Sequence, residues 1–453
     1  MSSQPILDSS LSGVLKQCLD KLQQGHKYGE YYQYLESEWI KTTSDLKLAM
    51  LDAQIWASLS IPARLKLELT ACLTEISNSG NITGTQMPKS ESANELKPHQ
   101  HETKMMNRIL ANADGIGDNI ERSKVVVRVP ASSANLGPGF DTIGMALDMW
   151  SEFTVERSDV FSITCEGEGE SDMPRDSTNL VCFGVAAAFE KAGKPLPVLK
   201  YHLVNRIPYA RGLGSSSAAI VGGLVAGLVL AGHQVKAWGA EDLLNMAADI
   251  EGHPDNVAPV VYGGIQLGIH TGSRWMTERV NLPPGMQCVC FIPEKIGKTS
   301  TARGVLADTV SRKEAVFNIG RVAFLINALA TNNIDQLKYG VEDALHQPQR
   351  AAAVYPHLQP IINAAVEKGA SAGYLSGAGP TVMALTSGAS GDIFTQRTKE
   401  RVDRKVAEAM LAAAGEYNVK GEVFITTPVE HGAYVVSADP PFSKGLVRYR
   451  GDV

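Results

Sequence analysis

The sequence shows little of what would mark a membrane protein or a nucleic-acid-binding protein. Its 453 residues contain 42 Lys and Arg against 48 Asp and Glu, which gives a formal net charge of -6 at pH 7. A chain with this charge has no general attraction for phosphate backbones or anionic lipids. Its most apolar stretch, residues 218–232, is shorter than the roughly 20 residues that a membrane-spanning helix needs. We therefore expect neither nucleic acid nor membrane as a partner, and we expect a buried helix in this stretch.

Cysteine is scarce and scattered along the chain. The six cysteines include one close pair, Cys288 and Cys290, which forms neither a Cys-x-x-Cys motif nor a zinc ligand set. The first residues contain no basic segment followed by an apolar run, and no Arg precedes Arg64. This pattern argues against secretory and mitochondrial presequences. We expect reduced thiols and a cytoplasmic protein.

What is present predicts a globular protein of two or three domains. Hydrophobic residues make up 44% of the chain and charged residues 20%, with 42 Gly, as in soluble proteins that contain helices and strands. Residues 78–122 are polar, broken by Gly and Pro and without a sustained apolar period, so they are expected to form a flexible linker. The linker separates two unlike parts of the chain.

Residues 1–77 carry apolar side chains at helical spacing and no strand-like alternation. We expect a small all-α module of unknown role. Residues 45–67, with Leu46, Trp56 and Leu65 among their apolar positions, resemble the SAM-like helical docking domains. That resemblance implies a surface that docks a protein or self-associates, although any compact helical bundle needs the same apolar spacing.

After residue 123, strand patterns and helix patterns alternate and predict an α+β body of two lobes with a cleft between them. The lobes are expected at residues 123–285 and 286–453. The expected strands are residues 124–129, 153–156, 199–205, 286–293 and 381–385. The expected helices are residues 177–192, 218–232, 241–250, 313–330, 358–368 and 393–414.

The strongest chemical signal is the segment at residues 208–219, Pro-Tyr-Ala-Arg-Gly-Leu-Gly-Ser-Ser-Ser-Ala-Ala, which leads into the apolar helix. Its glycines let the backbone approach a ligand, and the helix presents free amides and the positive end of its dipole. Three serine hydroxyls add donors to phosphate oxygens or a ligand for Mg²⁺. A plain Gly-Ser turn before a helix is the alternative. The run of serines and the long small-residue helix favour phosphate binding.

This segment resembles the central phosphate loop of the GHMP kinases, and two further segments agree. Residues 130–141, Pro-Ala-Ser-Ser-Ala-Asn-Leu-Gly-Pro-Gly-Phe-Asp, are similar to the first family motif in its homoserine-kinase form, and residues 376–381, Ser-Gly-Ala-Gly-Pro-Thr, to the third. The resemblance covers residues 123 to about 440 and implies the two-lobed GHMP kinase fold with ATP and Mg²⁺ as cofactors. The residues that it implies at the nucleotide are Pro208, Arg211, Gly212, Leu213, Gly214, Ser215, Ser216, Ser217, Thr299, Gly377 and Gly379.

The homoserine-kinase form also implies an acceptor site. An amino acid with a side-chain hydroxyl needs cations for its carboxylate, an anion for its ammonium and neutral polar groups around the hydroxyl. Arg303 and Arg350 resemble the family arginines that clamp the carboxylate, and Asp141 resembles the acid that holds the ammonium. The polar residues that match positions around the acceptor are Asn135, His253 and Asn256. In isolation, each of these residues would more often be a surface charge or a capping group.

The segment Glu-Gly-His-Pro-Asp-Asn at residues 251–256 is the most particular to this branch of the family. The resemblance implies that Glu251 joins Ser216 on Mg²⁺. A helix C-terminus followed by a Gly-Pro turn also explains the segment, but an acid there opposes the helix dipole.

For the mechanism, phosphoryl transfer needs mainly positioning and charge neutralisation, so we expect Asn135 and Asn256 to orient the hydroxyl. Asp141 as a base is second to its role at the ammonium. The resemblance therefore implies an ATP-dependent kinase that phosphorylates the side-chain hydroxyl of homoserine in threonine biosynthesis, and we expect a homodimer. A GHMP kinase for another hydroxylated metabolite and a catalytically silent nucleotide sensor stay open as alternatives.

Overall fold

A computed structural model describes residues 11–21, 27–37, 120–233, 240–386 and 393–442, together with the single positions 46, 65 and 69. The chain divides into two compact units, Met1–Pro98 and His99–Val453. Nearly all of the predicted linker, residues 78–122, lies outside the described residues. Among the helices of the described residues, none is long and apolar enough to cross a membrane.

The first unit contains helices α1 (Leu11–Lys21) and α2 (Tyr28–Ser37). The buried residues of α1 are three or four positions apart in the sequence. Residues at this spacing share one face of a helix, and that face of α1 points into the core. The buried residues form a small apolar cluster with single residues of later segments, and its members are Leu11, Val14, Leu15, Cys18, Leu19, Tyr31, Leu35, Leu46, Leu65 and Leu69. The helical pattern is therefore present where the structure describes this unit. Most of the segment that resembles SAM-like domains lies outside the described residues.

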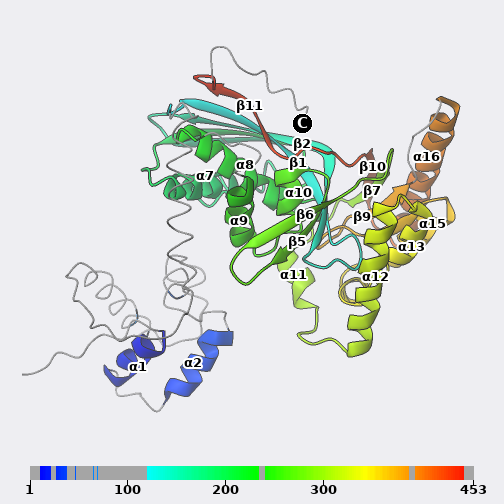
Figure 1. Cartoon of the computed structure of the whole chain (residues 1–453), viewed down its shortest axis with the longest axis horizontal. Coiled ribbons are helices and arrows are strands. Elements are labelled where there is room, and N and C mark those ends of the chain that lie inside the picture. Colours follow the sequence, from blue (N-terminus) through cyan, green and yellow to red (C-terminus); the bar gives the residue numbers. More distant parts are fainter. Residues whose placement is uncertain are drawn as a thin grey trace, which may run out of the picture. The chain divides into compact units, whose positions relative to one another are not determined.

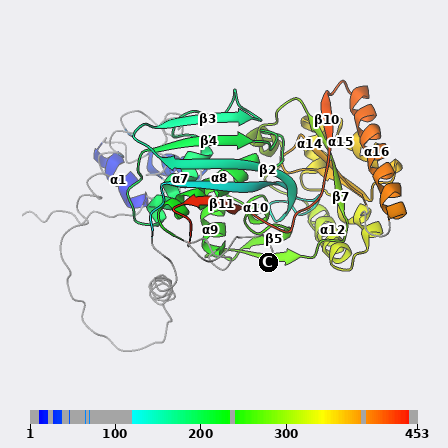
Figure 2. The ribbon, with the colours of Figure 1, turned by 90° about the horizontal axis from the view of Figure 1, so that it is seen from above.

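The second unit begins with a seven-stranded sheet. Five strands follow the order β11-β1-β2-β4-β3, and β5 pairs with β2 and with β6. The pairs are antiparallel apart from β3 with β4. The strands are β1 (Lys124–Ala134), β2 (Ile143–Arg157), β3 (Ser162–Gly167), β4 (Leu199–Asn205), β5 (Ile265–His270), β6 (Trp275–Val280) and β11 (Tyr434–Asp439). Figure 2 shows β3, β4 and β2 side by side.

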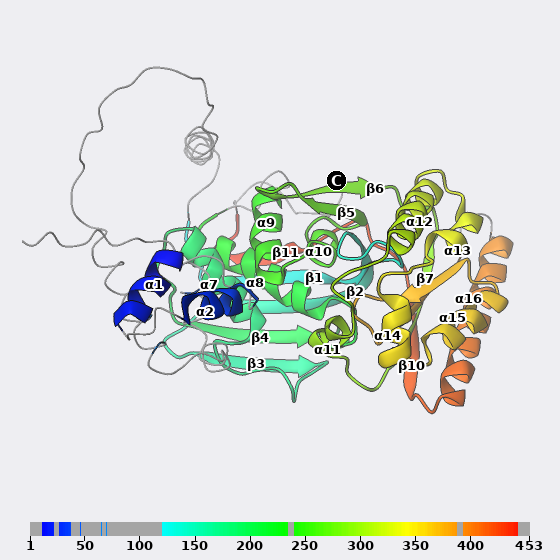
Figure 3. The same ribbon diagram turned by 90° about the horizontal axis from the view of Figure 1, so that it is seen from below.

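Helices cover one face of this sheet. In β1 the side chains of Val125, Val127 and Val129 are buried while their neighbours are more exposed, so one face of the strand points into the core. The covering helices lie below the sheet in Figure 1 and in front of it in Figure 3. They are α7 (Leu180–Lys191), α8 (Ser215–Leu230), α9 (Ala240–Glu251) and α10 (Val257–Tyr262).

Helix α8 is buried on almost every side, which explains its small residues. A Cβ on Gly223 would lie 2.3 Å from the backbone oxygen of Val181 in α7, and a Cβ on Gly184 would lie 2.6 Å from the oxygen of Ile220. The two helices therefore pack backbone against backbone, which side chains larger than hydrogen would prevent. This contact holds α8 against α7, and the phosphate loop ends where α8 begins, at Ser215.

The second lobe is built on a four-stranded antiparallel sheet with the order β10-β7-β9-β8. Its strands are β7 (Gln287–Pro293), β8 (Ala372–Leu375), β9 (Val382–Thr386) and β10 (Gly421–Thr426). Helices α15 (Leu358–Glu367) and α16 (Ile393–Glu416) pack on this sheet through an apolar cluster. The remaining helical elements are α11 (Thr299–Gly304), α12 (Arg312–Ala330), η3 (Ile334–Gln336), α13 (Leu337–Gly340) and α14 (Gln347–Ala353).

The α+β fold predicted from the sequence is confirmed, with a sheet for each lobe. The predicted boundary at residues 285/286 falls between β6 and β7, where the chain leaves the first sheet for the second. Strand β11 returns to the first sheet, where it pairs with β1, although its residues lie in the segment assigned to the second lobe. The second lobe of the fold therefore ends near β10.

Candidate active site

A cavity of about 510 Å³ is lined by residues of both lobes. The first lobe contributes Asn135, Ser216 and Glu251, and the second contributes Arg303 and Gly377. The three glycine-rich segments found in the sequence meet at this cavity. It therefore brings the predicted phosphate-binding and acceptor-binding residues into one space.

The phosphate loop enters helix α8 through Gly214, which has a φ of 70° and serves as the N-cap without a side-chain hydrogen bond. A Cβ at Gly214 would lie 2.0 Å from Ser132 Oγ, and a Cβ at Gly212 would lie 2.4 Å from the backbone oxygen of Ser376. Glycine is required at both positions because the loop is held between the first and third motifs. The first amides of α8 thus face the cavity as an anion site.

Hydrogen bonds join the first and third motifs directly. Ser133 Oγ lies 2.8 Å from Ser376 Oγ, and the Ser376 hydroxyl donates to the backbone oxygen of Gly212 at 2.7 Å. The Asn135 amide donates to the backbone oxygen of Gly377 at 3.0 Å. The glycine-rich third motif is therefore fixed against both the phosphate loop and the first motif.

The structure divides the predicted nucleotide residues into two groups. Six of them line the cavity: Gly212, Gly214, Ser215, Ser216, Thr299 and Gly377. The other five, which are not among the lining residues, are Pro208, Arg211, Leu213, Ser217 and Gly379. The Arg211 side chain donates to the backbone oxygens of Pro293 at 2.7 Å and Glu294 at 2.8 Å, so it ties the phosphate loop to β7.

The predicted metal pair lies at the cavity wall. Helix α9 ends at Glu251, as expected, and the Ser216 hydroxyl donates to Glu251 Oε1 at 2.7 Å. Two hard oxygen donors beside an anion site are the set that Mg²⁺ uses when nucleotide phosphates supply further ligands. The residues present therefore fit the cation that the resemblance implied.

At the acceptor end, Asp141 and Arg303 bind each other. The two guanidinium nitrogens of Arg303 donate to the two carboxylate oxygens of Asp141 at 3.0 and 2.7 Å. These bonds raise the pKa of Arg303, against the opposing effect of burial. Sequence reasoning had assigned the two residues to opposite ends of an amino acid without expecting them to pair.

His253 and Asn256 are held by a residue that sequence reasoning left without a role, Asp255. The buried Asp255 carboxylate is hydrogen-bonded to the His253 ring and accepts from the backbone amide of Asn256 at 2.7 Å. Burial alone would lower the pKa of His253, but the hydrogen bond and charge of Asp255 outweigh it and raise that pKa. Asn256 Oδ1 accepts from Ser132 Oγ at 3.0 Å, which places the asparagine against the first motif. The only available signal for Asp255 was its position between the two residues.

Arg350 is buried at the same end of the cavity. Burial, with the charge of Arg303 second, lowers the pKa of Arg350 to about 10. The ring centroid of Phe140 lies 5.4 Å from the guanidinium carbon of each arginine. The π system of the ring stabilises both cations. The sequence alone does not indicate this role for Phe140, because an aromatic residue after Gly-Pro-Gly can equally well belong to the hydrophobic core.

Comparisons with known proteins agree with this geometry. The family model described as "GHMP kinases N terminal domain" matches residues 179–264, and "GHMP kinases C terminal" matches residues 325–414. The homoserine kinase of Moorella thermoacetica is 42% identical over 311 residues, which cover 69% of this chain and 99% of that protein. The homoserine kinase of Desulfitobacterium hafniense is 38% identical over 312 residues, covering 69% of this chain and 100% of that protein.

Solved structures give the same result. The crystal structure of homoserine kinase from Cytophaga hutchinsonii superimposes with a TM-score of 0.61 at 26% identity, covering 70% of this chain and 98% of that one. Both family models and the near-complete coverage of relatives at 38% to 42% identity agree on one assignment. The chain belongs to the GHMP kinase family, in its homoserine kinase group.

Proposed function

We propose that this protein transfers the γ-phosphoryl group of ATP to the side-chain hydroxyl of L-homoserine, forming O-phospho-L-homoserine for threonine biosynthesis. One observation carries the proposal. A single cavity has a phosphate loop and a Ser216–Glu251 pair at one end and two arginines with Asp141 at the other. A nucleotide and a zwitterionic amino acid both find matching charges in that space.

At the phosphate end, the loop residues bind and orient ATP. The amides at the start of α8 and the hydroxyl of Ser215 face the cavity and donate to phosphate oxygens. Ser216 and Glu251 would hold Mg²⁺, which neutralises charge on the β- and γ-phosphates when it is bound. The Gly377 segment closes the loop from the other side, because its backbone is fixed to Asn135.

At the acceptor end, the charges match a zwitterion. The carboxylate of the amino acid takes donors from Arg303 and Arg350, and its ammonium takes an oxygen of Asp141. Both arginines remain cations near neutral pH, since a pKa of about 10 for Arg350 lies well above it. The Asp141–Arg303 pair presents both signs at one point, so each charged group of the ligand has a partner there.

The described cavity wall offers no free acid in the position of a general base, because Asp141 is engaged by Arg303, Glu251 by Ser216, and Asp255 by His253 and Asn256. Phosphoryl transfer with a loose transition state needs little base assistance. The amide nitrogen of Asn256 has only a 3.4 Å contact with Asp255, which leaves its donors for the acceptor hydroxyl. The roles left for side chains are therefore positioning and exclusion of water.

A coupled ADP-release assay tests this function. The full-length protein with Mg-ATP is offered homoserine, threonine, serine, mevalonate and galactose in turn. We expect turnover with homoserine far above the others, and NMR of the product should show phosphate on the side-chain oxygen. Turnover of galactose or mevalonate without homoserine would overturn the choice of acceptor. ATP binding without turnover of any acceptor would support a nucleotide sensor.

We further propose that the reaction takes place in the cytoplasm by a homodimer, and that residues 1–77 form a separate docking or self-association module. The separate module is supported by the position of the three kinase motifs, which all follow Lys124, the first residue of β1. A chain beginning near Arg122 should fold and phosphorylate homoserine, and proteases should cut first within residues 78–122 of the full protein. An insoluble or inactive truncated chain would argue that the N-terminal residues belong to the kinase core.

A further inference from the structure

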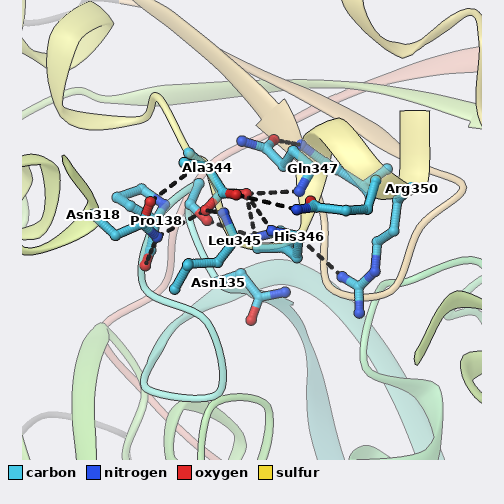
Figure 4. Close-up of polar contacts among 12 residues, drawn as sticks. Asn135, Pro138, Asn318, Ala344, Leu345, His346, Gln347 and Arg350 are labelled. Atoms are coloured by element: carbon cyan, nitrogen blue, oxygen red, sulfur yellow. Dashed lines mark hydrogen bonds and ion pairs between the residues drawn. The ribbon is translucent and has the colours of Figure 1, made fainter. Parts of the chain in front are cut away.

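The carboxylate of Asp343 is fully buried. Figure 4 shows the polar contacts around its partners Asn318, Leu345, His346 and Gln347. The carboxylate accepts hydrogen bonds from the backbone amides of Leu345 at 2.9 Å, His346 at 2.9 Å and Gln347 at 2.6 Å, and from the side chain of Asn318 at 2.8 Å. Four donors satisfy a buried carboxylate. The entry into helix α14 is therefore fixed by this one side chain.

The same network reaches the first motif in the other lobe. The Asn318 side-chain amide also donates to the backbone oxygen of Pro138 at 3.1 Å. His346 Nε2 lies 2.7 Å from the backbone oxygen of Gly137. A Cβ at Gly137 would lie 2.2 Å from the backbone oxygen of Val341, so the two segments are in close contact. The loop that carries Asn135 and Asp141 is thus anchored on the chain around Asp343.

The partners of His346 fix its protonation state. A carbonyl oxygen only accepts, so Nε2 must carry the proton that it donates to Gly137. Arg350 only donates, so Nδ1, 3.1 Å from Arg350 Nη1, must accept. The imidazole is therefore neutral, and burial, against the charge of Asp343, lowers its pKa in the same sense.

The guanidinium group of Arg350 is consequently held by protein atoms on its Nε and Nη1 side. Its Nε donates to the backbone oxygen of Ala302 at 3.0 Å, and Nη1 donates to Gly377 at 3.0 Å as well as to His346. Within the described part of the chain, Nη2 makes no hydrogen bond, and Arg350 lines the cavity. Three of the five guanidinium donors fix its orientation, which leaves the two on Nη2 for a ligand.

We propose that Asp343, Asn318 and His346 are positioning residues for the amino-acid acceptor: without touching it, they orient Arg350 so that Nη2 meets its carboxylate. This inference rests on the proposed function, because it assigns the carboxylate of homoserine to Arg350. It also explains why a buried histidine separates Asp343 from Arg350.

Two variants of His346 separate its contacts. In His346→Asn the side-chain oxygen takes the place of Nδ1 and still accepts from Arg350, but the bond to Gly137 is lost. In His346→Gln the terminal amide takes the place of Nε2 and still donates to Gly137, but the acceptor for Arg350 is lost. We expect His346→Gln to raise the KM for homoserine by about 10- to 100-fold, the effect of one hydrogen bond to a charged group. His346→Asn should stay within about threefold of the wild type.

Controls separate positioning from general damage. The KM for ATP should change less than about twofold in both variants, because the phosphate loop does not contact His346. Glu342→Gln, next to Asp343 but in a partly exposed pair with Arg321, should leave the KM for homoserine unchanged. Asn318→Ala provides a second route if a His346 variant does not fold, and it should raise the KM for homoserine and not that for ATP.

The outcomes are distinct for the two proposals. Equal KM values for homoserine in His346→Asn and His346→Gln, with both proteins less stable in thermal unfolding, would show a purely structural role and overturn the inference. An unchanged KM for homoserine in a folded Asn318→Ala would also contradict it. A wild-type protein that does not phosphorylate homoserine would instead refute the proposed function, and this inference with it.

Discussion

The Asp141–Arg303 pair allows the proposed acceptor site to be tested by a double-mutant cycle. The changes are Asp141→Asn, Arg303→Ala and the two together. Each single change leaves one charge of the pair without its partner at the cavity wall, whereas the double change leaves neither. Two hydrogen bonds, at 3.0 and 2.7 Å, join the residues, so the cycle measures an interaction of known geometry.

The expected sizes differ for folding and for catalysis. The side chains are 37% and 34% exposed, so solvent screens their attraction. Exposed pairs contribute at most about 1 kcal/mol, and a bidentate geometry about doubles it, which gives a coupling of about 1–2 kcal/mol in the free energy of unfolding. Loss of a charge-assisted contact to the ligand should cost about 2–5 kcal/mol of transition-state binding in each single variant.

Urea unfolding measures the first quantity, and kcat/KM for homoserine at saturating ATP measures the second. We expect the double variant to lose less than the sum of the two single losses, because no unpaired charge remains. The KM for ATP should barely change in any of the three. Additive losses in kcat/KM would show that the two residues act independently of each other on homoserine. Loss of ATP binding with normal use of homoserine would show that they serve another ligand.

Three further predictions concern the phosphate loop, the metal pair and the histidine of the acceptor site. Gly214→Ala should reduce turnover by at least about 100-fold, because Gly214 has a φ of 70° and no space for a Cβ, so that alanine would displace the loop. The control is Gly320→Ala in α12, where a Cβ meets no other atom; this variant should keep its activity, and its free energy of unfolding should rise by about 1 kcal/mol. Glu251→Gln should raise the Mg²⁺ concentration needed for half-maximal rate by on the order of tenfold, and an unchanged Mg²⁺ titration would argue against its role. The hydrogen bond and charge of Asp255 raise the pKa of His253 in the folded protein. The stability that His253 contributes is therefore fully present below its unfolded pKa of about 6.5 and is lost as pH rises through its folded pKa. Chemical unfolding at several pH values should therefore show the largest gap between the wild type and His253→Gln in acid, and a gap that widens toward alkaline pH would contradict this.

The elements that the sequence predicts best are those whose pattern is complete within one segment. Strand β4 has the predicted bounds, Leu199–Asn205, because buried and more exposed side chains alternate along it. Strand β1 was expected to end at residue 129 but continues to Ala134, through a bulge between Pro130 and Ala131. Proline and small polar residues are not typical of strands, so a strand that contains them is missed when a bulge and a buried partner strand accommodate them. Helix α8 likewise begins at Ser215, three residues before the apolar run that predicted it.

For the site, the sequence motifs indicated which residues are available, but not which of them pair. Both glycines and two of the three serines of the phosphate loop line the cavity, as do Asp141, Arg303 and Arg350. The Asp141–Arg303 pair joins residues 162 positions apart, and no pattern in either segment indicates it. The same holds for Phe140, which lies near both Arg303 and Arg350, and for the contact of Asp343 with Asn318. A single sequence shows which side chains are available for a site, whereas the fold determines which of them contact one another.

The return of β11 to the first sheet has a consequence for how the chain acquires its structure. Arg128 in β1 faces Tyr434 in β11, 306 positions later, and the second lobe is inserted between them. During synthesis β1 therefore has β2 on one side and an open row of amides and carbonyls on the other until β11 is made. Open edges of this kind pair with other chains, and closing so long a loop is slow. The first lobe is consequently the last to be completed, and its exposed edge is the point at which a nascent or truncated chain is most prone to aggregate.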